Sequence, residues 1–206
     1  MLYISQLRGM AASVLLPLVL LAANPAAAAD VEQARQLVRS ATTDAMAAFA
    51  GKKLTPDEAR NAMRQLIARY GDMETESRYM LGRYWSRSTS GSQQEFAALL
   101  ERFVVAAFGG MVNDVPADQR IEVRNADIQG DRVVVHSNVS SPGEETAAVD
   151  WIVAETAAGR PVIVDISAEG VTLLTTLQAD FTSVIRSSSG KLEALFEPLR
   201  RKVSTL

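Results

Sequence analysis

The spacing of hydrophobic positions along this chain changes between its two halves. In the first half they recur every three or four residues, as in a helix with one buried face, and in the second half they alternate, as in a half-buried strand. The clearest helical run follows Ser92-Gln93-Gln94-Glu95, whose residue types form a capping box. Its apolar members are Phe96, Leu99, Leu100, Phe103, Val104, Ala107, Phe108 and Met111.

Three further helical segments are expected before residue 90. An alanine-rich segment, 30–50, carries apolar residues on one face and is broken at Gly51. A second helix is predicted to begin after Thr55, because Thr55 and Glu58 form a capping box with Pro56 at the first helical position. It should run to about Tyr70. A shorter helical piece is expected around residues 75–84.

Short alternating segments in the second half predict four strands, the first near residue 121 and the others at 132–140, 146–155 and 162–166. The turns between them, such as Gly130-Asp131 and Pro142-Gly143, are too short for a parallel crossover, so neighbouring strands must be antiparallel. Two helices, about 171–185 and 191–202, follow. The expected fold is α+β: a curved antiparallel sheet of about four strands, covered by helices on one face.

The first thirty residues have the layout of a secretory signal peptide. Arg8 precedes an apolar run from Met10 to Ala23, and small residues follow it up to Ala29. The run is shorter than the roughly 20 residues that a helix needs to span a bilayer. We expect cleavage after Ala29, which leaves one domain, residues 30–206. A retained N-terminal membrane anchor is the alternative.

The amino-acid composition argues against several classes of function. The chain has no cysteine, so it forms no disulfide and no thiolate metal site, and it has a single histidine. Its formal net charge of −3 argues against nucleic acid as a partner, because phosphate binding needs a concentrated basic face. Neither a metal nor a cofactor is expected.

The single histidine, His136, is the one candidate for acid–base catalysis. A general base needs an orienting carboxylate, which Asp150 or Asp165 would supply across the sheet. A small enzyme with a cone of helices and sheet, like that of ketosteroid isomerase, would be a suitable host. A structural or surface-facing histidine is the alternative. The serine-rich segments do not form a nucleophile elbow, and Gly109 follows a helix instead of opening one.

Two sets of residues are candidates for binding. Arg83, Tyr84 and Trp85 combine cations with aromatic faces, which suits a pocket mouth, a contact with a partner protein or an aromatic anchor beneath the helices. A larger apolar set from the last two strands and the following helix would line either a packed core or a cavity. Its members are Val149, Trp151, Val153, Val162, Val164, Ile166, Val171, Leu174, Leu177, Phe181 and Ile185.

Several motifs resemble one family. Residues 81–85 (LGRYW) and 94–96 (QEF) resemble the signature of MlaC-type periplasmic phospholipid-binding proteins, also called the toluene-tolerance family. Residues 149–151 (VDW) resemble that family's VDY strand, with tryptophan in place of tyrosine. Residues 165–173 (DISAEGVTL) and 180–185 resemble its later turn and helix. The similarity spans most of the chain.

The resemblance implies a periplasmic lipid carrier that is not an enzyme and has no cofactor. Such a protein buries the acyl chains of a phospholipid between sheet and helices, so the apolar set named above would line a lipid pocket. It exchanges lipid with an inner-membrane ABC transporter complex and an outer-membrane lipoprotein complex, which maintains outer-membrane lipid asymmetry. A related subgroup is associated with hopanoid biosynthesis, which leaves a hopanoid-related cargo as an alternative.

Overall fold

The computed structural model describes residues 25–109, 112 and 115–205. The helices are α1 (Pro25–Phe49), α2 (Pro56–Tyr70), α3 (Met73–Leu81), α4 (Arg83–Arg87), α5 (Ser90–Gly109), α6 (Leu173–Ser187) and α7 (Phe196–Ser204), with a 3-10 helix η2 (Leu192–Leu195). The strands are β1 (Arg120–Gln129), β2 (Arg132–Ser140), β3 (Ala147–Glu155), β4 (Pro161–Ala168) and β5 (Val171–Thr172). They form one antiparallel sheet in chain order. The predicted α+β class is confirmed, with five strands instead of about four.

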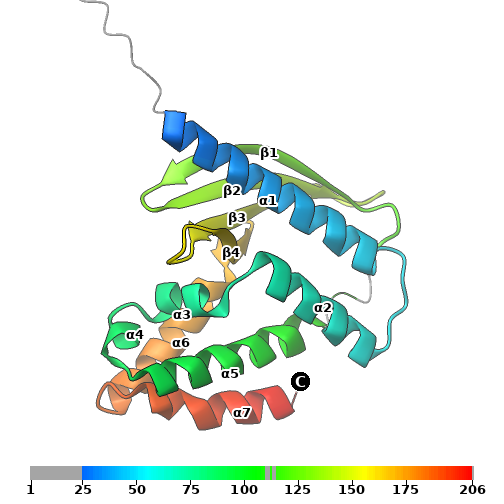
Figure 1. Cartoon of the computed structure of the whole chain (residues 1–206). Coiled ribbons are helices and arrows are strands. Elements are labelled where there is room, and N and C mark those ends of the chain that lie inside the picture. The colour runs from blue at the N-terminus through cyan, green and yellow to red at the C-terminus, as the bar shows by residue number, and fades with distance from the viewer. Residues whose placement is uncertain (1–24, 110–111, 113–114, 206) are drawn as a thin grey trace, which may run out of the picture.

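The elements form three layers (Figure 1). Helix α1 lies across one face of the sheet, and a layer of helices lies on the other side, where α3 and α6 contact β4. Covering on one face only, as the sequence analysis expected, is therefore wrong. The physical reason lies in β3, where Ile152, Val153 and Ala154 are consecutive and all buried, so the middle of the sheet needs cover on both faces.

Local signals explain most element boundaries. The Thr55 side chain accepts a hydrogen bond from the Glu58 amide, and the Glu58 carboxylate accepts one from the Thr55 amide, which completes the predicted capping box of α2. The capping box predicted at Ser92 is wrong. The Ser92 amide donates instead to the Thr89 hydroxyl, so α5 begins at Ser90. Glu95 is then left to pair with Arg200 of α7.

The passage from β4 to α6 is tighter than expected. Glu169 and Gly170 both adopt positive φ, 51° and 80°, and reverse the chain. Val171 and Thr172 then pair with Ala168 and Ser167 as the short strand β5, so α6 begins two residues later than predicted. The turn thus folds α6 back toward the sheet.

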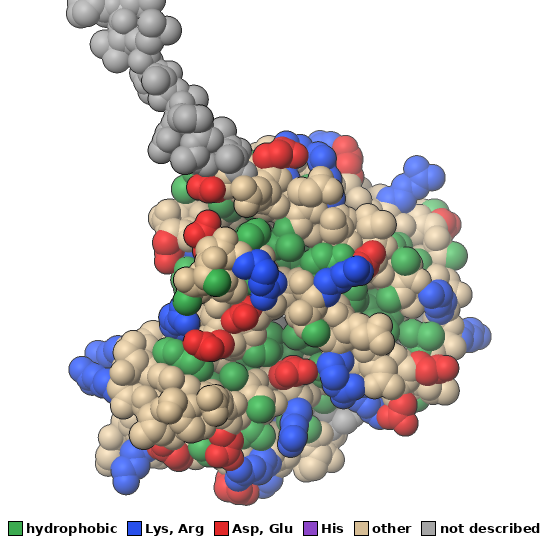
Figure 2. All heavy atoms as spheres, viewed as in Figure 1, with side chains coloured by type: hydrophobic (Ala, Val, Ile, Leu, Met, Phe, Trp, Pro, Cys, Tyr) green, Lys and Arg blue, Asp and Glu red, His purple; other side chains and the backbone are tan. Residues whose placement is uncertain are grey.

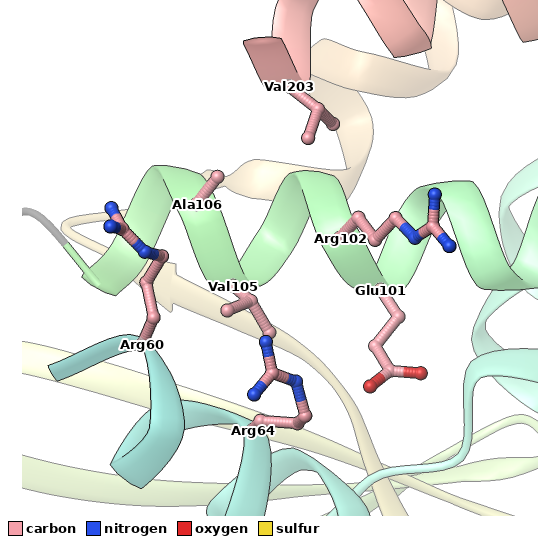
Figure 3. A pocket seen from close by; sticks show the side chains of 7 residues that line it. All are labelled: Arg60, Arg64, Glu101, Arg102, Val105, Ala106 and Val203. Carbon is pink, nitrogen blue, oxygen red and sulfur yellow. The ribbon is translucent and has the colours of Figure 1, made fainter. Parts of the chain in front are cut away.

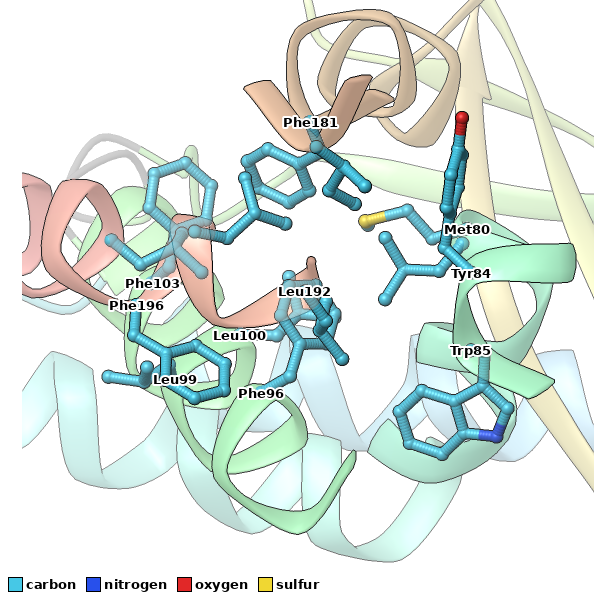
Figure 4. Packing of buried hydrophobic residues seen from close by; sticks show 14 residues of the cluster. Met80, Tyr84, Trp85, Phe96, Leu99, Leu100, Phe103, Phe181, Leu192 and Phe196 are labelled. Atoms are coloured by element: carbon cyan, nitrogen blue, oxygen red, sulfur yellow. The ribbon is translucent and has the colours of Figure 1, made fainter. Parts of the chain in front are cut away.

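The largest apolar cluster lies within the helical layer and is called the helical core here (Figure 4). Its side chains come from α3, α4, α5, α6, η2 and α7 and point toward one another. Phe96 and Phe181 meet edge to face, with ring centroids 5.9 Å apart. The buried members are Met80, Leu81, Tyr84, Trp85, Phe96, Leu99, Leu100, Phe103, Phe181, Ile185, Leu192, Leu195, Phe196 and Leu199.

The part of the chain described by the structure contains no helix long and apolar enough to cross a membrane. The expected signal peptide falls largely on residues 1–24, which lie outside the described residues. Its cleavage therefore stays a prediction, as does the single-domain boundary at residue 30.

Candidate functional site

The apolar residues predicted to line one pocket are divided among three places. Val149, Trp151 and Val153 share the α1 side of β3, and the helical core holds Phe181 and Ile185, with Leu177 packed against it. Val162 and Val164 face the helical layer. Ile166 and Val171 are exposed, and the side chain of Leu174 lies outside the described residues. The expectation of one shared wall is therefore corrected, whereas a role in lipid binding stays a prediction.

A β-bulge explains the division. Ile152 pairs with Asp165 and Val153 pairs with Ile163, so Val164 is an extra residue in β4. The bulge changes which side chains point to which face. Ile166, opposite Trp151, therefore points to the α1 side, and Val164 points to the other. Simple alternation along residues 162–166 could not show this change.

The face of the sheet opposite α1 carries a small aliphatic cluster, called the α3–sheet seam here: Ile152, Ala154, Val162 and Val164, with Tyr79 of α3 packed against them. These side chains are smaller than those of the helical core. The seam is the one place among the described residues where buried aliphatic side chains of the sheet meet the helical layer as a cluster. It is therefore the part of the structure that matches the predicted location between sheet and helices.

Helix α3 brings unpaired polar groups into this region. Glu76, one turn before Tyr79, is 8% exposed, and its carboxyl has no hydrogen-bond partner among the described residues. Burial, and secondarily the charge of Asp165 on β4, raises the pKa of Glu76 to about 8. The adjacent Ser77 hydroxyl is fully buried, also without a partner in the described chain. Buried groups that the fold leaves unpaired are unusual and often mark functional sites.

Tyr79 is held at the edge of the seam. Its hydroxyl donates to the Asp131 carboxylate at 2.9 Å, and the Arg132 guanidinium lies 4.2 Å from its ring centroid. Burial, together with Asp131, raises the pKa of Tyr79, so the hydroxyl stays protonated and able to donate. Neither Glu76 nor Tyr79 was predicted as a site residue, because their segment, METESRYML, is polar enough to resemble a solvated helix.

His136 lies away from the seam, in a network of carboxylates. Nδ1 is 2.7 Å from Asp150 and Nε2 is 3.0 Å from Asp127. The predicted partnership with Asp150 is present, whereas Asp165 is not hydrogen-bonded to the ring. These hydrogen bonds, that to Asp150 first, raise the pKa of His136. Both nitrogens lie against carboxylates, which favour the protonated ring, so neither nitrogen is free to act as a base.

The predicted pocket-mouth residues separate into two kinds. Tyr84 and Trp85 are buried members of the helical core, and the Gln93 side chain donates to the Trp85 carbonyl. Arg83 is exposed and stacks over Tyr84. The aromatic pair therefore anchors α4 to the core in this structure, and Arg83 alone offers surface to a ligand or partner.

Among the cavities that the described residues form, two open at the surface. The first, the sheet-end groove of about 490 Å³, lies where the β1–β2 and β3–β4 turns meet the start of α1 and Tyr79 of α3. The second, of about 360 Å³, lies between α2, α5 and α7, and Figure 3 shows three arginines around it. Its lining residues are Arg60, Arg64, Glu101, Arg102, Val105, Ala106 and Val203. Of the residues predicted from sequence, Val153 lines the first cavity and none lines the second.

Charged side chains of both signs are interspersed on the face seen in Figure 2, and apolar side chains show between α1 and α2. No group of acidic and histidine side chains in the described part of the chain is arranged to hold a metal ion. The site therefore consists of apolar surface with a few buried polar groups.

Comparisons with known proteins agree with the fold described above. The profile of the MlaC protein family matches residues 36–201. Among solved structures, a phospholipid-binding protein from Ralstonia solanacearum, determined in complex with a phospholipid, has a similar fold. The TM-score is 0.68 at 24% identity, over 84% of this chain and 97% of that one. No curated protein matches the sequence. The family match covers most of the chain, and the protein belongs to the MlaC family.

Proposed function

We propose that this protein is a periplasmic lipid carrier that holds the acyl chains of a phospholipid between its sheet and its helical layer. One observation carries the proposal: the chain shares its fold, over nearly all of that protein's length, with a protein determined in complex with a phospholipid. Membership of the MlaC family points the same way. The α3–sheet seam is the region of this chain that would separate to admit the chains.

The free energy of moving a lipid from a membrane to this protein favours a carrier whose direction of transport depends on its docking partners. Burying a methylene is worth roughly 0.8 kcal/mol, so two acyl chains would gain on the order of 20 kcal/mol relative to water. A bilayer offers the chains a similar environment, so the net free energy of transfer from membrane to carrier is small. Direction then comes from the partners. We propose an inner-membrane ABC transporter complex and an outer-membrane lipoprotein complex, and a role in outer-membrane lipid asymmetry.

The enzyme alternative is weaker than the carrier. His136 was its only general base, and both of its ring nitrogens lie against carboxylates. A metal site or a second histidine would be needed instead, but the sequence has a single histidine and no group among the described residues is arranged to hold a metal ion. A hopanoid-related lipid remains the second candidate for the cargo, because the apolar seam selects for hydrocarbon and not for a particular headgroup.

The test is to identify the bound lipid. The protein is exported from a Gram-negative host, purified from the periplasmic fraction without detergent and extracted with organic solvent. Mass spectrometry of the extract should find phospholipid at close to one molecule per chain. A hopanoid in its place would select the second cargo. An extract without lipid, from folded protein, would contradict the carrier.

A further inference from the structure

Tyr79 lies at the border between the sheet-end groove and the α3–sheet seam. Its ring packs against the seam on one side and lines the groove on the other. Ala154 also belongs to both. Among the groove's other lining residues, Ile128 and Val133 are apolar, and Ile128 is half exposed. Ile128, Val133 and Val153 line the groove from the α1 side of the sheet, so Tyr79 and Ala154 form the border between the groove and the seam.

Tyr79 is held in place by polar contacts that contribute little to stability. Its hydroxyl donates to Asp131 in the β1–β2 turn, and Arg132 covers the ring. A second tether joins α3 to the β3–β4 turn, where Arg160 lies 3.6 Å from Asp72. Both tethers are at the surface, where a hydrogen bond or an ion pair contributes on the order of 1 kcal/mol or less to stability. Helix α3 therefore meets both hairpin turns through weak polar contacts, one at its N-cap, Asp72, and one in its last turn, at Tyr79.

Helix α3 is also built to separate from the sheet. It is nine residues long, and it lies between Gly71 and Gly82, the latter with φ of +51°. Its inner face presents the buried carboxyl of Glu76, which would gain solvent or ligand contacts on opening. Met80 and Leu81, which follow Tyr79 in the chain, belong instead to the helical core. Opening would thus take place at the sheet side.

We propose that the sheet-end groove is the mouth through which an acyl chain of a phospholipid enters the α3–sheet seam, and that Tyr79 is its gate. This proposal rests on the proposed carrier function and specifies where the lipid passes. The apolar lining of Ile128, Val133 and Ala154 suits the hydrocarbon. The rim charges, Asp131 and Arg132, would leave a polar headgroup in water.

The first test compares rates of lipid exchange. Purified protein is mixed with vesicles that contain a fluorescently labelled phosphatidylethanolamine, and the uptake and release rates are followed. Tyr79→Phe and Asp131→Ala each remove the hydrogen bond, so each should speed exchange about two- to tenfold, the equivalent of one hydrogen bond. The double variant should be no faster than either single one, because both act on the same contact. Glu74→Gln, on the exposed side of α3, is the matched control.

The second test closes the mouth. The chain has no cysteine, so Tyr79→Cys with Asp131→Cys can be joined specifically by a bifunctional thiol reagent with a reducible linker. Exchange should stop in the joined protein and return after reduction. A control pair, Arg35→Cys with Arg124→Cys, joins α1 to β1 on the opposite face, where the Arg35 side chain donates to the Arg124 carbonyl. That link should leave exchange unchanged.

The outcomes separate the two proposals. If the wild-type protein exchanges lipid and neither Tyr79→Phe, Asp131→Ala nor the link across the mouth changes the rate, the gate is overturned. The carrier proposal then stays intact. Wild-type protein that takes up no phospholipid overturns both. Unfolding curves of each variant, compared with wild type, show whether a changed rate reflects the gate or a damaged fold.

Discussion

The helical core and the α3–sheet seam are both buried, yet they are built differently. The core packs large aromatic and aliphatic side chains from six elements, and its buried members are all apolar. The seam packs small aliphatic side chains against Tyr79, with the unpaired Glu76 one turn away on the same helix. A dense apolar cluster gains its full stability only when closed. Unpaired polar groups lower the gain from closure, so the seam can separate while the core stays intact.

The largest expected effect tests the core against the seam. Leu100→Ala in the core should cost about 3–5 kcal/mol in the free energy of unfolding, and Ile152→Ala in the seam about 2 kcal/mol or less, because the seam can collapse or hydrate around the lost atoms. The two substitutions remove the same number of carbon atoms. Urea unfolding of delipidated protein measures both. Equal costs would mean that the seam is as firmly packed as the core.

Glu76 should make stability depend on pH. Its folded pKa, about 8, lies above the ordinary 4.5, so the folded protein retains a proton that the unfolded chain releases. Its contribution is therefore full below pH 4.5 and declines as pH rises toward 8. The stability of Glu76→Gln relative to wild type should increase by about 3 kcal/mol between pH 4.5 and pH 7.

Urea unfolding at both pH values checks this expectation, with Glu74→Gln as a control because Glu74 is exposed on the same helix. A difference between Glu76→Gln and wild type that does not change with pH would show that Glu76 is solvated, which would remove the contrast between seam and core.

His136 should have the smallest effect. Its pKa is raised by Asp150 and Asp127, so its stabilising contribution is present below the ordinary value of 6.5 and is lost as pH rises through the raised value. His136→Ala should slightly lower the melting temperature at pH 6 and leave it unchanged at pH 9. Lipid exchange should stay at the wild-type rate. A folded variant without function in the envelope would return attention to the enzyme alternative.

The sequence predicted the elements better than their spatial relations. Thr55 and Pro56 mark the start of α2 by local hydrogen bonding, and the β2 alternation gave both ends of that strand, because each depends on nearby residues alone. The bulge at Val164 depends on pairing with β3, and it reversed the side on which Ile166 lies. Local patterns carry no signal for such a shift in register.

The candidate site was harder to predict for a related reason. Glu76 and Ser77 have the residue types of an exposed helix face, and only the packing of α3 against the rest of the fold reveals their burial. Tyr84 and Trp85 were conspicuous in the family motif, but they stabilise the helical core. The resemblance identified the family correctly, whereas the positions of its side chains depended on the three-dimensional packing.

A pair of substitutions on opposite faces of the sheet tests the proposal that the space between sheet and helical layer holds the lipid. Val164 faces the seam and Val135 faces α1, and both are at least 98% buried. The measurement is phospholipid per mole of purified protein, with the melting temperature of the delipidated form.

If the lipid lies in the seam, Val164→Trp should remove the bound phospholipid with little change in melting temperature, because the ring takes space used by acyl chains. Val135→Trp should overpack a closed cluster, at a cost of about 1–3 kcal/mol in stability, while the protein that remains folded keeps its lipid. The opposite result would contradict a lipid site in the seam: a Val164→Trp protein that loses as much stability as Val135→Trp and still carries a full complement of lipid.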